Sequence, residues 1–374
     1  MTEGLAVTAG WDLPVEDPSH VHAAVTMADA AVTRAGLALA DRASFALIAT
    51  ELATNLVRHA RQGRLVATAT DPGPAAWVQL AAVDHGPGIP DVAAAMADGY
   101  STANSLGGGL GACRRAAAAF DLWTSAASAR TASTGPRTAA VSGTSGPGTV
   151  IIARIGPGAS SNLFSPTSHI RVGGILSARA GEQESGDAWG VTWDADTVMI
   201  VIMDGLGHGP DAARAAANGL HELTTPPDPA GPGDPVTLLG RLDRRLLGGR
   251  GAVAAVARLS PGQLAYGGVG NIGARLGPNG RAHGLVSSLG TLGLGQRLRP
   301  QASVSPWRGP NLFTAHSDGI RSSWDLSRYP GVTGHDPAVM AALIWRDAAA
   351  GNDDAAVVVA TASQPAPARA GERG

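Results

Sequence analysis

The chain has 374 residues, 44% of them hydrophobic, so its length and composition predict two or three domains with buried cores. The net charge of −2 argues against a nucleic-acid partner held by bulk electrostatics. All 28 basic residues are arginine, which excludes a Walker A lysine or a Schiff-base lysine, and the single Cys113 excludes an internal disulfide. No apolar run is long enough for a membrane span and no secretory leader is visible, so we expect a cytoplasmic protein without membrane or nucleic-acid partners.

The N-terminal part is expected to begin with a strand, followed by two helices and several strands. The first helix is predicted over Val21–Ala35, and the second over Ala43–Ala60 with Asp41 as its cap. Further along we expect strands at Val66–Thr70, Trp77–Val83 and Gly148–Ile155, and a helix at Ala112–Phe120. Residues 126–148 are nearly all small or polar, which predicts a flexible loop inside this domain.

The C-terminal part is predicted to contain many strands and few helices. Helices are expected from Pro210 onward and over Val236–Leu247. The expected strands are Ala188–Trp193, Thr197–Met203, Ala252–Ala257, Leu264–Gly268, Leu312–His316 and Ala355–Ala360. This pattern favours an α+β sandwich.

The second predicted helix carries a polar face with chemical potential. Glu51, Asn55 and His59 are spaced four residues apart, so they share one side of the helix. An asparagine oxygen suits Mg²⁺ and a neighbouring glutamate suits a general base, whereas a merely solvated polar stripe is the alternative for this helix alone. His59 is expected to be structural, at the end of the helix.

Two glycine-containing segments follow this helix. Asp84-His85-Gly86-Pro87-Gly88 begins at the end of a predicted strand, where the glycines allow a ligand to approach the backbone closely. The run Gly107–Gly111 leads into a predicted helix and would offer amide N–H groups to phosphates.

The order of these motifs resembles the GHKL ATP-binding fold, and within it the RsbT-type serine kinases and anti-sigma regulators, over about Trp11 to Ile155. The resemblance implies that Glu51 is the catalytic base, that Asn55 binds Mg²⁺ and that Asp84 binds the adenine of ATP. The same resemblance implies further nucleotide-binding positions at Gly86, Gly88, Gly107, Gly108, Gly109, Leu110 and Gly111. The departures from the family pattern are the insertion before Gly148 and the third glycine of the lid.

In the C-terminal part, acidic residues recur where strands meet loops. Asp187, Asp204, Asp318 and the doublet Asp353-Asp354 each adjoin a predicted strand. One Asp-Gly pair is usually a turn, but four acids beside strands of one sandwich favour convergence on hard cations. Two such ions lower the pKa of a bridging water and direct it at a phosphate ester.

These aspartate motifs resemble those of SpoIIE-type, PP2C-like protein phosphatases, including the small RsbX-type members, over about Leu163 to Thr361. The resemblance implies one metal at Asp187, Asp204 and the Gly205 carbonyl, and a second at Asp204, Asp318 and Asp353. The choice between Asp353 and Asp354 stays open, and His208 is expected to pack a turn rather than touch substrate. The expected fold is therefore α+β, an N-terminal GHKL (Bergerat) α/β sandwich followed by a PP2C-like α-β-β-α sandwich. The expected boundaries are 1–156 for the ATP-binding domain, 157–162 for a linker, 163–361 for the phosphatase domain and 362–374 for a disordered tail.

Together the two resemblances imply a bifunctional switch regulator. It would be an ATP-dependent serine kinase joined to a phosphatase that uses Mg²⁺ or Mn²⁺, acting on a STAS-type antagonist protein or another sigma-factor regulator. Two alternatives stay open: a phosphatase gated by ATP with an inactive kinase domain, and a non-enzymatic anti-sigma binding module. The resemblance to kinases of this type also leaves a homodimer open.

Overall fold

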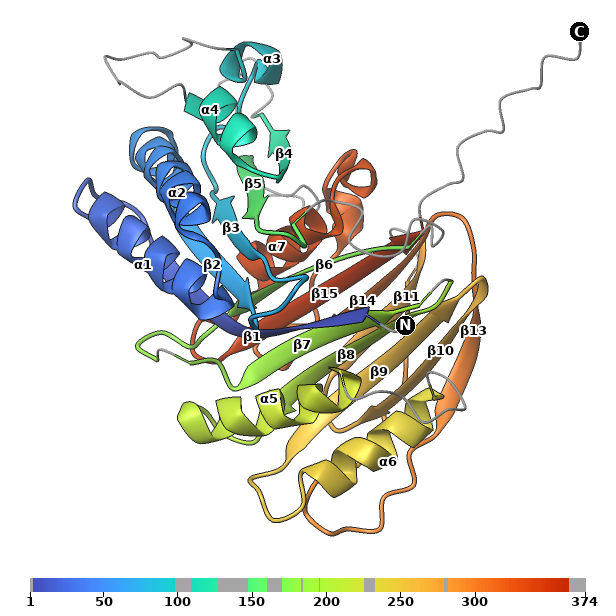
Figure 1. The fold of residues 1–374 in the computed structure, drawn as a ribbon. Coiled ribbons are helices and arrows are strands. Elements are labelled where there is room, and N and C mark those ends of the chain that lie inside the picture. The colour runs from blue at the N-terminus through green and yellow to red at the C-terminus, as the bar shows by residue number, and fades with distance from the viewer. Residues whose placement is uncertain are drawn as a thin grey trace, which may run out of the picture.

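Two antiparallel sheets organise the chain in the computed structural model (Figure 1). The structure describes residues 3–97, 109–126, 147–159, 170–182, 184–194, 196–224, 233–278 and 282–362. A sheet of ten strands has the order β13-β10-β9-β8-β7-β1-β2-β3-β5-β4, and a sheet of five has the order β12-β11-β14-β15-β6. No helix in these ranges is long and apolar enough to cross a membrane.

The elements alternate along the chain as follows. The N-terminal half contains β1 (Glu3–Pro14), α1 (His20–Ala35), α2 (Leu39–His59), β2 (Arg64–Thr70), β3 (Val78–Val83), α3 (Val92–Ala95), α4 (Gly109–Ala116), β4 (Ala119–Ser125) and β5 (Gly148–Ile155). The C-terminal half begins with β6 (Ile170–Ser177), β7 (Asp187–Trp193), β8 (Val198–Gly205), α5 (Pro210–Thr224), α6 (Pro235–Arg245), β9 (Ala252–Ser260) and β10 (Gly262–Val269). It continues with β11 (Gly273–Pro278), β12 (His283–Gly284), β13 (Ala302–Trp307), β14 (Asn311–His316), two short 3₁₀ turns (Leu326–Arg328 and Val332–Gly334), α7 (Pro337–Ala348) and β15 (Ala355–Ala362).

Strand β1 joins the two halves into one sheet. Its first residues pair with β7 and its later residues with β2, with a register shift between Val7 and Ala9. The small sheet crosses the large one at Gly10, where a Cβ would lie only 2.1 Å from the Leu176 carbonyl oxygen. Only glycine permits this approach, so the contact between the sheets depends on the sequence at this position.

The layers follow from the alternation of side chains along the strands. Helices α5 and α6 cover the outer face of the C-terminal strands of the large sheet, whose inner face packs on the small sheet. In the N-terminal half, α1, α2 and α4 cover one face of the large sheet and α7 covers the other (Figure 1). The C-terminal half thus has the layers α-β-β-α, and the predicted α+β class is confirmed.

Helix α7 lies between the two sheets. Ten of its side chains are buried, from Pro337 to Trp345 and at Ala348, against strands of both halves. Because the helix is apolar on every side, it lacks the amphipathic pattern that marks a surface helix. That is why the sequence analysis missed it, although Asp336-Pro337 is a recognisable helix start: the Asp336 side chain accepts a hydrogen bond from the Ala338 N–H.

A buried ion pair fixes α7 to the N-terminal sheet. Arg154 on β5 is 2% exposed and donates two hydrogen bonds to the Asp336 carboxylate, at 2.7 and 2.9 Å. Its Nε donates to Gln79 at 2.7 Å, and Gln79 donates to the Gly174 carbonyl at 3.0 Å. Burial opposes ionisation of Asp336, but the Arg154 charge and hydrogen bonds more than offset it and lower the Asp336 pKa. The pair therefore satisfies two charges that would otherwise be costly to bury.

Several predicted boundaries needed correction. The second helix begins at Leu39, so Asp41 lies inside its first turn and does not cap it. The helix predicted over Ala112–Phe120 ends at Ala116, and Phe120 belongs to strand β4. Strands β6, β11, β12 and β13 were not predicted, because glycine, polar and exposed residues dilute their patterns. The domain boundaries stay predictions, and most of 126–148 and residues 363–374 lie outside the described residues.

The buried pair gives a direct stability test. We predict that Arg154→Met lowers the free energy of unfolding by about 3–5 kcal/mol, because Asp336 is left buried and uncompensated. Arg171→Met is the matched control, since Arg171 is half-buried and reaches Asp336 only at 4.0 Å; its loss should be under about 1 kcal/mol. Urea unfolding followed by circular dichroism measures both, and equal effects would contradict the role of Arg154.

Candidate functional sites

The first candidate site lies on α2. Glu51 and Asn55 are half-buried and one turn apart, as predicted, and α4 packs alongside them. Burial and then the nearby Glu51 charge raise the pKa of the Cys113 thiol on α4 to about 12. Glu51 therefore lies close to the helix that follows the glycine run. His59 is exposed in the last turn of α2.

Asp84 follows β3 directly and is held by backbone contacts. Its N–H donates to the Thr149 carbonyl at 3.0 Å, and its Oδ1 accepts the Gly86 N–H at 2.5 Å. The next residue, His85, donates its N–H to the Arg61 carbonyl at 2.9 Å, which fixes the loop to the end of α2. Burial raises the pKa of the Asp84 carboxyl despite these hydrogen bonds. Asp84 is thus a buried, oriented acid beside Glu51 and Asn55 on the same half of the sheet.

Two glycine positions behave as the motif predicts. Gly88 has a φ of +78°, and a Cβ there would lie 2.5 Å from the Ser125 carbonyl oxygen. Gly109 has a φ of +58° and begins α4, in which Leu110 and Gly111 are buried. The predicted lid residues Gly107 and Gly108 lie outside the described residues.

The second candidate site is centred on two facing aspartates. Asp187 on β7 and Asp204 on β8 are direct partners in the antiparallel ladder, so their side chains share one face of the sheet. Asp187 is 2% exposed and accepts a hydrogen bond from the Ser317 hydroxyl at 2.5 Å. Ser317 in turn accepts the Ala356 N–H at 3.0 Å, which links β15 and the end of β14 to the pair.

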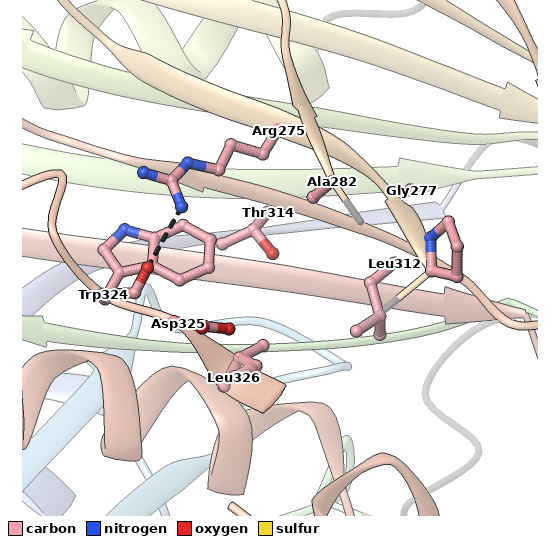
Figure 2. A pocket seen from close by; sticks show the side chains of 9 residues that line it. Arg275, Gly277, Ala282, Leu312, Thr314, Trp324, Asp325 and Leu326 are labelled. Carbon is pink, nitrogen blue, oxygen red and sulfur yellow. Dashed lines mark hydrogen bonds between the residues drawn. The ribbon is translucent and has the colours of Figure 1, made fainter. Parts of the chain in front are cut away.

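Asp318 extends this site into the loop after β14. Its Oδ2 accepts a hydrogen bond from the Asn271 side chain at 2.9 Å. Arg275 anchors the same loop farther along, because its guanidinium lies 4.1 Å from the Trp324 ring centroid and donates to the Trp324 carbonyl at 3.1 Å (Figure 2). The pocket drawn in Figure 2 therefore has its arginine occupied by the chain's own carbonyls.

The acidic doublet divides into two roles. The Asp354 carboxylate is buried and accepts the Arg179 N–H at 2.7 Å and the Gly186 N–H at 2.8 Å. Asp353 is exposed and accepts only the Asp354 N–H, at 3.0 Å, through one oxygen. Asp354 thus positions the loop that leads into Asp187, whereas Asp353 retains a free oxygen. This difference favours Asp353 over Asp354 as a ligand.

Electrostatics place the four acids in one neighbourhood. Burial and then the Asp204 charge raise the pKa of Asp187 well above its usual value. Burial raises the pKa of Asp204 to about 7, with further contributions from Asp318, Asp353 and Asp354. No three of the described His, Cys, Asp or Glu side chains converge as a ready-made metal cage. The donor set nevertheless fits a divalent cation, because every donor is a hard oxygen and a cation would relieve the repulsion between Asp187 and Asp204.

Sequence analysis missed several residues that position these sites. Ser317 was part of a quoted motif but its hydrogen bond to Asp187 had no sequence signal. Thr149 was recognised only as part of a closing strand. Arg346, on the unpredicted α7, donates from Nη1 to the Asp84 carbonyl at 3.0 Å. His208 is exposed and contacts Glu182 at 3.1 Å, which agrees with a role in the turn.

Comparisons with known proteins identify the N-terminal segment. Residues 15–122 match the model of the histidine kinase-like ATPase domain family, and this segment is such a domain. The chain is 35% identical over 88 residues to the serine/threonine-protein kinase RsbT of Bacillus subtilis (strain 168). The match covers 23% of this chain and 65% of RsbT, so the chain spans slightly less than two thirds of that relative.

Solved structures resemble the chain over about half its length. A chain described with the bacterial stressosome is 29% identical, covers 51% of this chain and 98% of that chain, and has a TM-score of 0.46. RsbX in complex with magnesium is 18% identical, with coverage of 51% and 94% and a TM-score of 0.43. The case for a metal site in the C-terminal half rests on its aspartates.

The two roles in the acidic doublet are separable by experiment. We predict that Asp354→Ala lowers the Tm in EDTA, because two backbone N–H groups lose their acceptor at a cost of about 1–3 kcal/mol. Asp353→Ala should keep the Tm in EDTA but lose the rise in Tm that Mn²⁺ gives the unaltered protein by mass action. Differential scanning fluorimetry measures both. The reverse pattern would make Asp354 the ligand.

Proposed function

We propose that the chain is a bifunctional regulator of a partner-switching pathway: an ATP-dependent protein serine kinase joined to a metal-dependent serine/threonine phosphatase. The substrate class is a STAS-type antagonist protein or a related sigma-factor regulator. The N-terminal assignment is supported by the ATPase-domain match and by the identity to a protein named as a serine/threonine kinase. The phosphatase assignment is carried by one observation, the facing pair Asp187 and Asp204.

For the kinase step, each proposed role matches a described position. Asp84 would accept a hydrogen bond from the adenine amino group at the floor of the site, and Gly88 gives the base room. Asn55 would hold Mg²⁺ through its side-chain oxygen. Glu51 would accept the proton of a serine hydroxyl as that oxygen forms a bond to the γ-phosphorus of ATP and the bond to ADP breaks. Orientation and charge neutralisation would supply most of the acceleration.

For the phosphatase step, water and a phosphoserine would give serine and inorganic phosphate. Asp187, Asp204, the Gly205 carbonyl, Asp318 and Asp353 would hold a pair of Mg²⁺ or Mn²⁺ ions. When bound, such ions supply an activated water and neutralise charge on the phosphate. Ser317 orients Asp187 through its hydroxyl and Asp354 holds the loop before it, so the chain fixes the acids before any ligand arrives.

The bifunctional proposal predicts two separable losses. Glu51→Gln should reduce transfer of phosphate from ATP to a STAS protein by about 10²-fold or more, the usual value of a general base, and leave phosphate removal intact. Asp204→Asn should have the opposite selectivity. Controls are Glu16→Gln, on the exposed segment before α1, and Asp196→Asn, in the turn at the other end of the β7–β8 hairpin. Radiolabelled ATP and a Mn²⁺ chase measure both steps. If both Glu51→Gln and Asp204→Asn leave transfer and removal unchanged, the proposal is wrong.

A second candidate function, a phosphatase gated by ATP, is favoured by the contacts of α7. Arg346, whose side chain is 1% exposed, bonds to the Asp84 carbonyl and also to Asp347 at 2.7 and 3.0 Å. Asp347 lies 3.0 Å from the His85 ring, in the same loop as Asp84. The proposed adenine site therefore contacts the C-terminal turn of a helix from the other half.

The same turn continues into the aspartate site. Ala349 forms a bridge with Ile320, and the Ala350 N–H donates to the Gly319 carbonyl at 2.8 Å. Gly319 follows Asp318, and Ala350 precedes Asp353 by three residues. A nucleotide that moves Asp84 would displace Arg346 and, through this turn, two of the proposed metal ligands. Such a connection provides the two-state element that gating needs.

Gating predicts a nucleotide response that depends on Arg346. We expect a non-hydrolysable ATP analogue to change the rate of phosphoserine hydrolysis by about fivefold, the low end of measured couplings. In Arg346→Met the ratio of rates with and without analogue should fall to about one. Arg321→Met is the control, because Arg321 is exposed and contributes only its backbone N–H to Ala348. An identical ratio in all three proteins would contradict gating through α7.

A further inference from the structure

Beside the proposed metal centre lies an exposed surface made of Leu206, Leu247, Arg250 and Leu294, which we call the leucine–arginine rim. The three leucines are 37%, 54% and 46% exposed. Leu206 is the residue after Gly205, whose carbonyl is a proposed ligand. Exposed leucines grouped at the edge of a polar site are typical of protein interaction surfaces.

The rim is held together at Gly251. The Leu206 N–H donates to the Gly251 carbonyl at 3.1 Å, and a Cβ on Gly251 would lie 3.2 Å from Leu294 Cδ2. Ala252, the next residue, pairs with Gly205 on one side and exchanges hydrogen bonds with Leu292 on the other. The leucines are therefore fixed to the strand ends that carry the metal site.

Arg250 lies over the loop that follows Asp204. A Cβ on Gly207 would lie 3.5 Å from Arg250 Nη1 and 3.8 Å from Nη2, so the guanidinium covers this glycine. Arg250 is two positions before Ala252, about 7 Å along a strand from the residue paired with Gly205. Within the described part of the chain its guanidinium has neither an ion pair nor a hydrogen bond.

The charge around the rim is positive. Arg244 and Arg245, at the end of α6, are exposed, whereas Arg241 is half-buried and paired with Glu222. The nearby Asp243 accepts the Gly293 N–H at 2.7 Å. An arginine-rich rim thus adjoins an acidic centre, which suits a ligand that brings a phosphate to the centre and acidic groups to the rim.

We propose that the leucine–arginine rim binds the phosphorylated segment of a protein substrate. Arg250 binds the phosphate or an adjacent acidic group, and Leu206 and Leu294 take an apolar side chain next to the phosphoserine. This inference rests on the proposed phosphatase function. The occupant is a phosphoprotein segment rather than free phosphate, because an anion alone leaves the exposed leucines without a partner.

The test uses the full chain with Mn²⁺ and two synthetic phosphoserine peptides. One peptide has leucine and glutamate beside the phosphoserine, and the other has glycine and serine there. We expect kcat/KM to be about tenfold higher for the first peptide. Leu294→Asp should remove most of this preference, whereas Leu39→Asp, at an 82% exposed leucine at the start of α2, should keep it.

Arg250 has its own readout. Arg250→Gln should raise KM by about tenfold on both peptides with a smaller change in kcat, and Arg250→Lys should recover part of the loss because the charge is kept. Arg299→Gln, at an exposed arginine outside the rim, is the control. Circular dichroism confirms that each variant is folded.

The outcomes separate the rim from the phosphatase assignment. Hydrolysis of both peptides with equal kcat/KM, together with no effect of Arg250→Gln, would overturn the rim alone. No hydrolysis of either peptide by the unaltered protein would overturn the phosphatase assignment and the rim with it. A preference that Leu294→Asp leaves intact would show that the leucines do not bind the flanking residues.

Discussion

The structure depends on the buried contact between Arg154 and Asp336. Two charges inside the protein are tolerable only when their geometry is good and their remaining hydrogen bonds are satisfied. Here the pair is bidentate, Gln79 completes the arginine, and the carboxylate also begins α7. The contact therefore fixes a fully apolar helix between two sheets and makes the two halves of the chain one packed body.

This arrangement explains why two distant chemistries are structurally adjacent. The sheet that carries the proposed nucleotide site and the sheet that carries Asp318 and Asp353 both pack on α7. The last turn of α7 contacts Asp84 through Arg346 and the loop after Asp318 through Ala350. A kinase and a phosphatase acting on one protein in opposite directions would benefit from such a connection, because their rates could then respond to the same nucleotide.

Local sequence patterns predicted much of the fold but not its central element. Strands such as β8 and β15 were found because continuous β-branched runs have one common explanation, a buried strand. Helix α7 was missed because a helix apolar on every side has no periodicity, and its burial depends on residues almost 200 positions away. Likewise the four aspartates could be named from their strand ends, whereas the separate roles of Asp353 and Asp354 required the positions of the Arg179 and Gly186 N–H groups.

The most direct test of the account is whether nucleotide binding in one half reaches the acids of the other. Hydrogen exchange can be followed by mass spectrometry with Mg²⁺ held constant, with and without a saturating non-hydrolysable ATP analogue. The account predicts changed exchange in segments 346–354 and 317–321, in addition to the residues around Asp84. Changes confined to the N-terminal half, with both C-terminal segments unaltered, would contradict it.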